Sequence, residues 1–154
     1  MNLYSDHQIL HSAIRDICSQ SSQKKSLKLI RTHVEIALRE LSLDSFAKFE
    51  HDLYEHIFSL VYSRSIDDKR GGVLAIRELV NSPSAIPDTK ISKFCEVLSN
   101  SLSLNSNFDL LEMMASALGY ILKYTPVPLV DVIESELKRA LEWLRGSEAP
   151  RRLA

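Results

Sequence analysis

The stretch FAKFEHDLYEHIFSLV, residues 46–61, decides the fold class of this 154-residue chain. Its apolar side chains recur mainly three or four positions apart, which places them along one face of an α-helix. A β-strand would instead need strict alternation of apolar and polar residues. The stretch therefore predicts an amphipathic helix that buries one side. The residues of this stripe are Phe46, Phe49, Leu53, Ile57, Leu60 and Val61.

Similar helical patterns extend from this stretch in both directions. The five prolines lie outside the strongly periodic segments, as expected because proline in a helix interior loses a hydrogen bond and clashes with the preceding turn. No run of β-branched residues with period two lies between turn signals, so no sheet is expected. The sequence predicts an all-α chain with seven helices, over about residues 6–18, 23–41, 43–61, 67–81, 88–102, 108–123 and 129–145.

The composition excludes several classes of protein. Charged residues make up 25% of the chain and the net charge is −1, which does not fit a nucleic-acid-binding polycation. The longest apolar run, residues 73–76, is too short to cross a membrane, and the first residues show no basic-then-apolar pattern, so we expect neither a membrane span nor secretion. Cys18 and Cys95 form no CxxC pair, so neither a disulfide scaffold nor a zinc ribbon is expected. We expect the protein to stay inside the cell.

A repeat of 42 residues relates the helices to one another. When the sequence is aligned with itself at this shift, Phe49 aligns with Ile91 and Ile133, and Ala75 aligns with Ala117. Helix pairs that repeat at this length are typical of HEAT and armadillo arrays, whose periods are ~40–47 residues. The sequence therefore predicts an α-solenoid of HEAT-like antiparallel helix pairs. The other interpretation is a chance match between the stripes of an ordinary helix bundle.

The repeat also predicts where the chain divides. Residues 1–42 would form an N-terminal helical pair, 43–81 and 88–124 two HEAT-like repeats, and 129–154 the start of a further repeat. In this register the last second helix would start near Arg151, so the chain is expected to be the front end of a longer solenoid. Each glycine costs about 1 kcal/mol in a helix interior relative to alanine. The pair Gly71–Gly72 is therefore expected to mark a closely packed neighbouring helix.

Few residues suggest chemistry. His7 and His11, four positions apart on the first helix, could bind a metal only with a third ligand, and no HExxH glutamate accompanies them. Lys69 and Arg70 precede Gly71–Gly72, which is the wrong order for a phosphate-binding loop. Paired carboxylates and nucleophile turns are not found in the sequence. We predict no catalytic, cofactor-binding or metal-binding residue in this segment.

A group of basic residues is the candidate surface for binding a partner. Arg64, Lys69, Arg70 and Arg77 lie at the start of the helix over 67–81 or along it, and could form a basic ridge. The competing interpretation is an ordinary solvated helix face.

Seven short segments carry a resemblance to a known family. They are LRELS (38–42), IFSLV (57–61), DKRGGVLAI (68–76), TKISKF (89–94), MASALG (114–119), KRALEWL (138–144) and RRLA (151–154). In order and spacing they resemble the N-terminal HEAT region of the TOR (target of rapamycin) serine/threonine kinases, which belong to the phosphatidylinositol-3-kinase-related group. The resemblance covers about residues 23–154, and the chain departs from the family's pattern at 81–88, 131–137 and 146–150.

The resemblance implies a role as well as a fold. In such kinases the catalytic domain lies far downstream, so this segment would be a non-catalytic scaffold without cofactors. It would help to assemble a growth-controlling, nutrient-responsive kinase complex by binding a raptor-type adaptor or other complex subunits. The full-length kinase would be dimeric and cytoplasmic, with peripheral association to endomembranes through its partners, and would bind no nucleic acid and span no membrane.

Two other functions remain open from the sequence. One is a stand-alone helical-repeat adaptor that has no kinase domain. The other is a small enzyme whose helical-bundle site contains His7 and His11.

Overall fold

The computed structural model describes residues 12–18, 23–81, 88–124 and 130–147, and every regular element among them is an α-helix. The expectation of an all-α fold is confirmed, and the six labelled helices, α2 to α7, begin and end within one residue of the predicted positions. Of the predicted helix over 6–18, residues 12–17 are helical and residues 6–11 lie outside the described residues. The stacking of HEAT-like repeats, with its boundaries at 1–42, 43–81, 88–124 and 129–154, stays a prediction.

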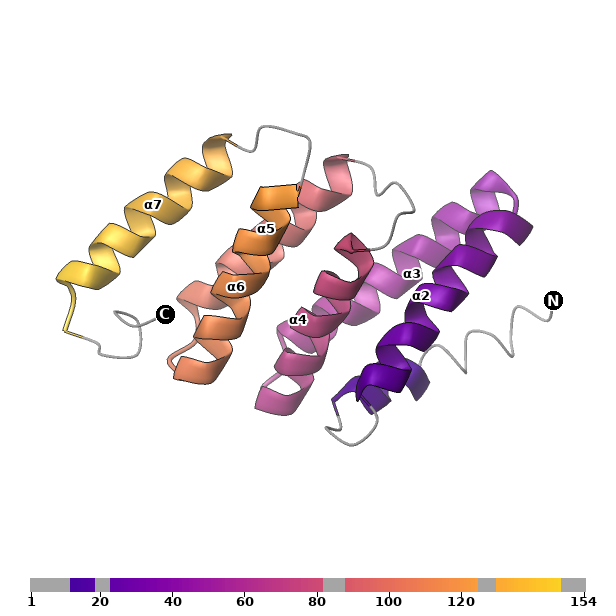
Figure 1. Cartoon of the computed structure of the whole chain (residues 1–154), viewed down its shortest axis with the longest axis horizontal. Helices are drawn as coiled ribbons and strands as arrows, with labels where there is room; N and C mark the ends of the chain where they lie inside the picture. Colours follow the sequence, from indigo (N-terminus) through magenta and orange to yellow (C-terminus); the bar gives the residue numbers. More distant parts are fainter. Residues whose placement is uncertain (1–11, 19–22, 82–87, 125–129, 148–154) are drawn as a thin grey trace. The chain divides into compact units, whose positions relative to one another are not determined.

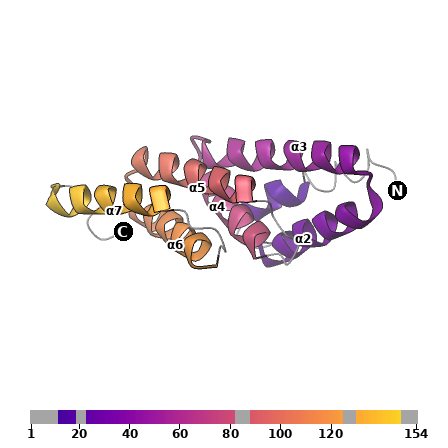
Figure 2. The ribbon, with the colours of Figure 1, turned by 90° about the horizontal axis from the view of Figure 1, so that it is seen from above.

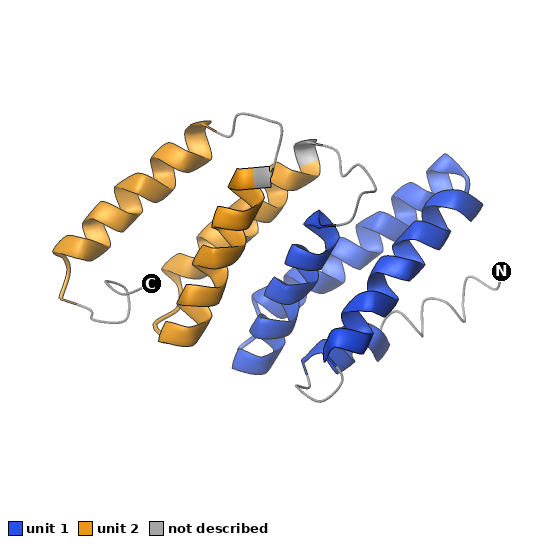
Figure 3. Cartoon of the chain, in the orientation of Figure 1, with its two compact units in different colours: residues 1–84 blue, residues 85–154 orange. Residues whose placement is uncertain are grey.

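The chain divides into two compact units, Met1–Ser84 (unit 1) and Ala85–Ala154 (unit 2), which Figure 3 colours separately. Unit 1 contains the helical residues 12–17 and three longer helices. These are α2 (Gln23–Glu40), α3 (Leu43–Val61) and α4 (Ile66–Val80).

Serine residues set the starts of α3 and α4. The hydroxyl oxygen of Ser42 accepts the backbone N–H of Ser45 at 3.3 Å, and that of Ser65 accepts the N–H of Asp68 at 3.3 Å. Each bond satisfies one of the N–H groups that the first turn of a helix leaves without an intrahelical partner. Both helices therefore begin directly after their capping serine.

Within unit 1, α3 packs against α4, and α2 contacts both (Figures 1 and 2). An ion pair between Arg31 Nη2 and Glu78 Oε1, at 2.5 Å, links α2 to α4. The core is formed by the apolar faces of these helices together with the helical residues 12–17. Its fully buried side chains include Ile14, Ile17, Ile30, Ile57, Val61, Val73 and Ile76.

The glycine pair of α4 lies where neighbouring helices come closest. A Cβ atom added to Gly72 would lie 2.7 Å from Val61 Cγ2, 2.9 Å from Val61 N and 3.1 Å from the Ile57 carbonyl oxygen of α3. A Cβ atom added to Gly71 would instead lie 2.6 Å from the sulfur of Cys18. The expectation that the pair permits close packing is confirmed, because each glycine faces a different neighbour at a distance that leaves no room for a side chain.

Unit 2 contains α5 (Asp88–Ser103), α6 (Phe108–Tyr124) and α7 (Val130–Arg145). Its core lies between α5 and α6. In the turn between them, the buried Asn105 side chain donates to the Ser101 carbonyl oxygen at 2.5 Å, and the Asn107 side chain caps α6 by accepting the N–H of Leu110 at 3.0 Å. The third helix, α7, contacts α5 and contains no buried residue. The fully buried side chains of this core include Phe94, Leu98, Leu110, Leu111, Met114 and Ile121.

Candidate interaction surfaces

The four basic residues predicted to bind a partner lie around one end and one side of α4. Arg64 is exposed in the turn before the helix, Lys69 and Arg70 are half-buried near its start, and Arg77 is exposed further along. An α-helix turns by about 100° per residue, so Arg70 and Arg77, seven positions apart, lie on the same side. Lys69 is rotated by about 100° from Arg70. The structure therefore aligns two of the four residues on α4 and does not place all four along one face.

Metal-ligating side chains and cysteine thiols are two kinds of group that could support chemistry in the described residues. No group of three or more His, Cys, Asp or Glu residues that could hold a metal ion occurs among them, and His7 and His11 lie outside the described part of the chain. Burial, with Asp68 nearby, raises the pKa of the Cys18 thiol to about 11. Burial, with Glu136 nearby, raises the pKa of the Cys95 thiol to about 11 as well. Both thiols are therefore protonated at neutral pH, where a nucleophile would need to be a thiolate.

Unit 2 contains a groove between two of its helices. It lies between α6 and α7, has a volume of about 380 Å³, and includes Leu102 of α5 in its lining. An added Cβ atom at Gly119 would meet no atom within 4 Å, so α6 leaves open space on this side. The lining is mainly apolar. It consists of Leu102, Ala115, Leu118, Gly119, Leu122, Glu136, Arg139, Ala140, Trp143 and Leu144.

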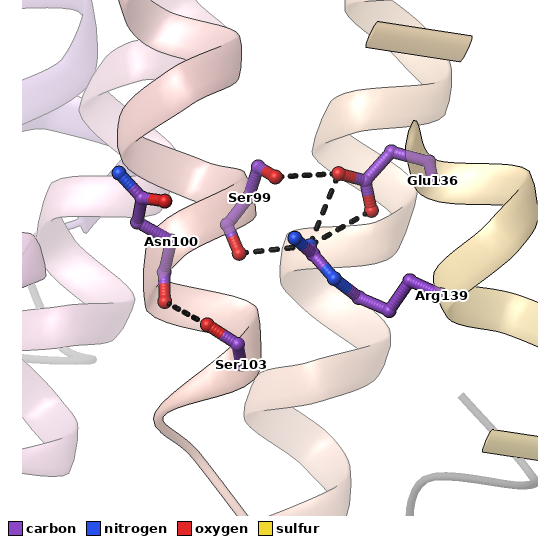
Figure 4. Close-up of polar contacts among 5 residues, drawn as sticks. All are labelled: Ser99, Asn100, Ser103, Glu136 and Arg139. Atoms are coloured by element: carbon purple, nitrogen blue, oxygen red, sulfur yellow. Dashed lines mark hydrogen bonds and ion pairs between the residues drawn. The ribbon is translucent and has the colours of Figure 1, made fainter. Parts of the chain in front are cut away.

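The two charged residues of the groove are already paired. The Ser99 hydroxyl of α5 donates to Glu136 Oε1 of α7 at 2.5 Å, and Arg139 Nη1 donates to both Glu136 carboxylate oxygens at 3.0 Å (Figure 4). The same Arg139 nitrogen donates to the Ser99 carbonyl oxygen at 2.8 Å. Only 19% and 20% of the Arg139 and Glu136 side chains are exposed. This cluster fixes α7 to α5 and leaves the groove without an unbalanced charge.

A different side of α7 carries an exposed apolar stripe. Positions 130, 133, 137, 141 and 144 repeat at spacings of three and four, so their side chains share one face of the helix. Half-buried Val132, Glu136, Arg139 and Trp143 form the other face. The α7 stripe therefore comprises the exposed residues Val130, Ile133, Leu137, Leu141 and Leu144, and Leu144 also lines the groove.

Comparison with known proteins identifies a family. No family model and no solved structure matches the chain. Its sequence is 30% identical over 137 residues to the serine/threonine-protein kinase TOR of Arabidopsis thaliana, a match that covers 88% of this chain and 6% of that kinase. It is 29% identical over 128 residues to the serine/threonine-protein kinase tor1 of Schizosaccharomyces pombe, with coverages of 83% and 5%. A rice TOR kinase is 32% identical over 117 residues, with coverages of 76% and 5%.

The chain belongs to the TOR family as a segment of it. The segment spans only 5–6% of the length of these curated relatives, so it corresponds to a small part of a TOR kinase. None of the described helices of this TOR segment is long and apolar enough to cross a membrane.

The groove and the α7 stripe of this TOR segment were not among the surfaces predicted from the sequence. A signal for them exists in the 42-residue register, which places Ile133 and Leu137 of α7 at the positions of Ile91 and Cys95 of α5. The register shows that α7 has an apolar face. It does not show which face of α7 is covered, because that depends on neighbouring helices.

Proposed function

We propose that this TOR segment is a non-catalytic scaffold and protein-interaction region that helps to assemble a TOR-type kinase complex with adaptor subunits. The observation that carries the proposal is the match of one all-helical segment to several TOR kinases. Rigid helix pairs present extended surfaces, which suits binding of other proteins better than a chemical reaction. The full-length protein would then be a serine/threonine kinase that controls growth in response to nutrients.

The partner would be a raptor-type adaptor or another subunit of the TOR complex, and the complete kinase would be dimeric within that complex. Its place of action would be the cytoplasm, with peripheral association to endomembranes through the partners. The side of α4 that carries Arg70 and Arg77 is the proposed contact, with Arg64 and Lys69 at its N-terminal end. Basic side chains at such a surface favour a partner with an acidic patch and speed the encounter with it.

The test is charge reversal in the full-length kinase. Arg70→Glu with Arg77→Glu changes the surface charge by four units, and Lys24→Glu with Lys25→Glu makes the same change at exposed positions of α2. We expect the first pair to reduce recovery of the raptor-type adaptor with the kinase, while the second pair leaves it unchanged. The activity of the purified kinase toward a short peptide is expected to stay the same in both proteins.

Equal recovery of the adaptor with both double variants would contradict the proposed contact. Circular dichroism of the 154-residue segment with each pair of substitutions controls for unfolding. A transcript that ends without a kinase domain would instead support the stand-alone adaptor.

A further inference from the structure

The turn between α5 and α6 matches the turn between α3 and α4. The two turns consist of residues 104–107 and 62–65, four residues each, and are 42 positions apart. The last residue of each turn, Asn107 or Ser65, caps the helix that follows by accepting the backbone N–H three positions later. The 42-residue register therefore extends from the helices to these two turns.

The backbone of each turn is held by the same hydrogen bond. The Ser63 N–H donates to the Leu60 carbonyl oxygen at 3.0 Å. At the matching positions, the Asn105 N–H donates to the Leu102 carbonyl oxygen at 3.3 Å. A pre-organised backbone loses little conformational entropy when a partner binds to it, which favours binding. Both turns are therefore suited to presenting their side chains to another molecule.

Each turn exposes two large apolar side chains at matching positions. Leu104 and Phe108 at the α5–α6 turn are 75% and 37% exposed, and Tyr62 and Ile66 at the α3–α4 turn are 48% and 45% exposed. One residue of each pair is the first of its turn, and the other is the first of the helix that follows. Scattered exposed apolar residues are ordinary. The repetition of the same pair at two matching turns instead indicates a surface that contacts another molecule.

The exposed charges beside the α5–α6 turn are acidic. Asp109 and Glu112, both exposed near the start of α6, are the only charged residues in the sequence between positions 97 and 122. Asp67 occupies the position that matches Asp109 and is also exposed. The α3–α4 turn differs because it contains exposed Arg64, which has no basic counterpart in the α5–α6 turn. The charge that the two turns share is therefore negative.

We propose that the α5–α6 turn is a docking site for a protein partner whose binding segment carries large apolar side chains next to Lys or Arg. The apolar side chains would cover Leu104 and Phe108, and the basic one would lie beside Asp109 and Glu112. The α3–α4 turn binds the same kind of segment more weakly, because Arg64 repels its basic residue.

An anionic membrane is the other surface that exposed apolar residues at a turn suit. Its negative headgroups attract Lys and Arg, so carboxylates beside the apolar residues would oppose contact. Asp109 and Glu112 thus favour a basic protein segment over lipid. The proposal rests on the interaction role proposed above and adds a second contact, whose preferred charge is opposite to that of the side of α4 with Arg70 and Arg77.

The test titrates the isotope-labelled 154-residue chain with a synthetic amphipathic helix of leucine and lysine, about 18 residues long. The matched peptide has glutamate in place of every lysine. Backbone amide signals in nuclear magnetic resonance spectra report binding residue by residue. We expect the leucine–lysine peptide to shift the signals of residues 104–112, and the leucine–glutamate peptide to need about a tenfold higher concentration for the same shift.

Substitutions at the α5–α6 turn separate its apolar contribution from its charge. Leu104→Ser is expected to weaken binding at residues 104–112 about tenfold, because a leucine side chain no longer becomes buried. Asp109→Lys with Glu112→Lys is expected to reverse the preference between the two peptides. Leu38→Ser is the matched control, since Leu38 is 50% exposed on α2 and lies outside both turns. It is expected to leave binding unchanged, and far-UV circular dichroism checks that every variant keeps its helices.

A single substitution tests the weaker turn. Arg64→Ser gives the α3–α4 turn the residue type that Ser106 supplies in the α5–α6 turn. The shifts of residues 62–68 are then expected to appear at a lower concentration of the leucine–lysine peptide. An unchanged or higher concentration would contradict the proposed role of charge at the turns.

The proposal is overturned if both peptides shift residues 104–112 equally, or if the leucine–lysine peptide shifts only α7, which would assign it to the α7 stripe. Binding to phosphatidylserine vesicles that Leu104→Ser abolishes, with no response to the peptides, would assign the turn to a membrane instead. Shifts at residues 104–112 that grow with protein concentration alone would assign it to a second copy. None of these measurements involves adaptor recovery, so the contact at Arg70 and Arg77 can fail while this docking site holds, and the reverse.

Discussion

The close approach of α3 and α4 at Gly72 leads to a quantitative prediction for Gly72→Ala. The new methyl group would lie 2.9 Å from Val61 N and 3.1 Å from the Ile57 carbonyl oxygen. Both are backbone atoms, so they can move only if α3 moves. Overpacking of this kind costs about 1–3 kcal/mol, and the higher helix propensity of alanine returns about 1 kcal/mol. The free energy of unfolding is therefore expected to fall by ~1 kcal/mol, and by about 2 kcal/mol at most.

Gly119→Ala is the matched control for this substitution. It makes the same chemical change in the interior of another helix, but no atom lies within 4 Å of the new methyl group. Only the propensity gain of about 1 kcal/mol then applies. The two variants are expected to shift stability in opposite directions and to differ by ~2 kcal/mol.

Thermal and urea unfolding followed by far-UV circular dichroism measure this difference. A loss of 1 kcal/mol lowers the Tm by ~4–8 °C when a unit of 60–100 residues unfolds by itself, and by ~2–4 °C when about 150 residues unfold together. Gly72→Leu is expected to give a larger drop than Gly72→Ala. If Gly72→Ala raised the Tm as much as Gly119→Ala does, the close packing of α3 on α4 would be refuted.

Three further predictions concern single groups. Arg139→Met removes the bonds that hold Glu136 and the Ser99 carbonyl, and is expected to destabilise unit 2 by about 1–2 kcal/mol in urea unfolding; an unchanged midpoint would show that the cluster does not anchor α7. Because the pKa of both Cys18 and Cys95 is raised from 9.0 to about 11, each thiol is expected to react with a disulfide reagent at pH 8 about a hundredfold more slowly in the folded chain than in urea, and equal rates would contradict this. Burial and the hydrogen bond to Glu50 raise the pKa of Tyr54 above its ordinary 10.0, so its contribution to stability is complete below pH 10 and is lost as the pH rises beyond it. Tyr54→Phe is expected to reduce this alkaline loss of stability, and an unaltered pH profile of the Tm would exclude the assignment.

The sequence was sufficient to predict the helices because their signals are local. Apolar spacing identified α3, proline positions marked the connections, and the costly Gly71–Gly72 pair indicated a close neighbour. Each of these signals depends on residues within a few positions of one another. The bounds of the described helices and the packing at the glycine pair therefore followed from the sequence.

The candidate surfaces were less accessible to sequence analysis, because they depend on which neighbour covers each face. Glu136 and Arg139 are charged and would be expected in solvent, yet they form the side of α7 that is fixed to α5. Leu137 and Leu144 would be expected in a core, yet they are exposed. A pattern of spacing shows that α7 has two different sides, but the covered side is decided by contacts with α5 and α6.

The two adjacent glycines of α4 also restrict how this segment can change in length. Gly71 and Gly72 point toward different neighbours, since consecutive helical residues differ in direction by about 100°. Inserting or deleting one residue between Ser65 and Gly71, with the cap held in place, would rotate both glycines and bring side chains against Cys18 and Val61. We therefore expect insertions and deletions among related sequences to avoid the first two turns of α4 and to gather in the connections between helices.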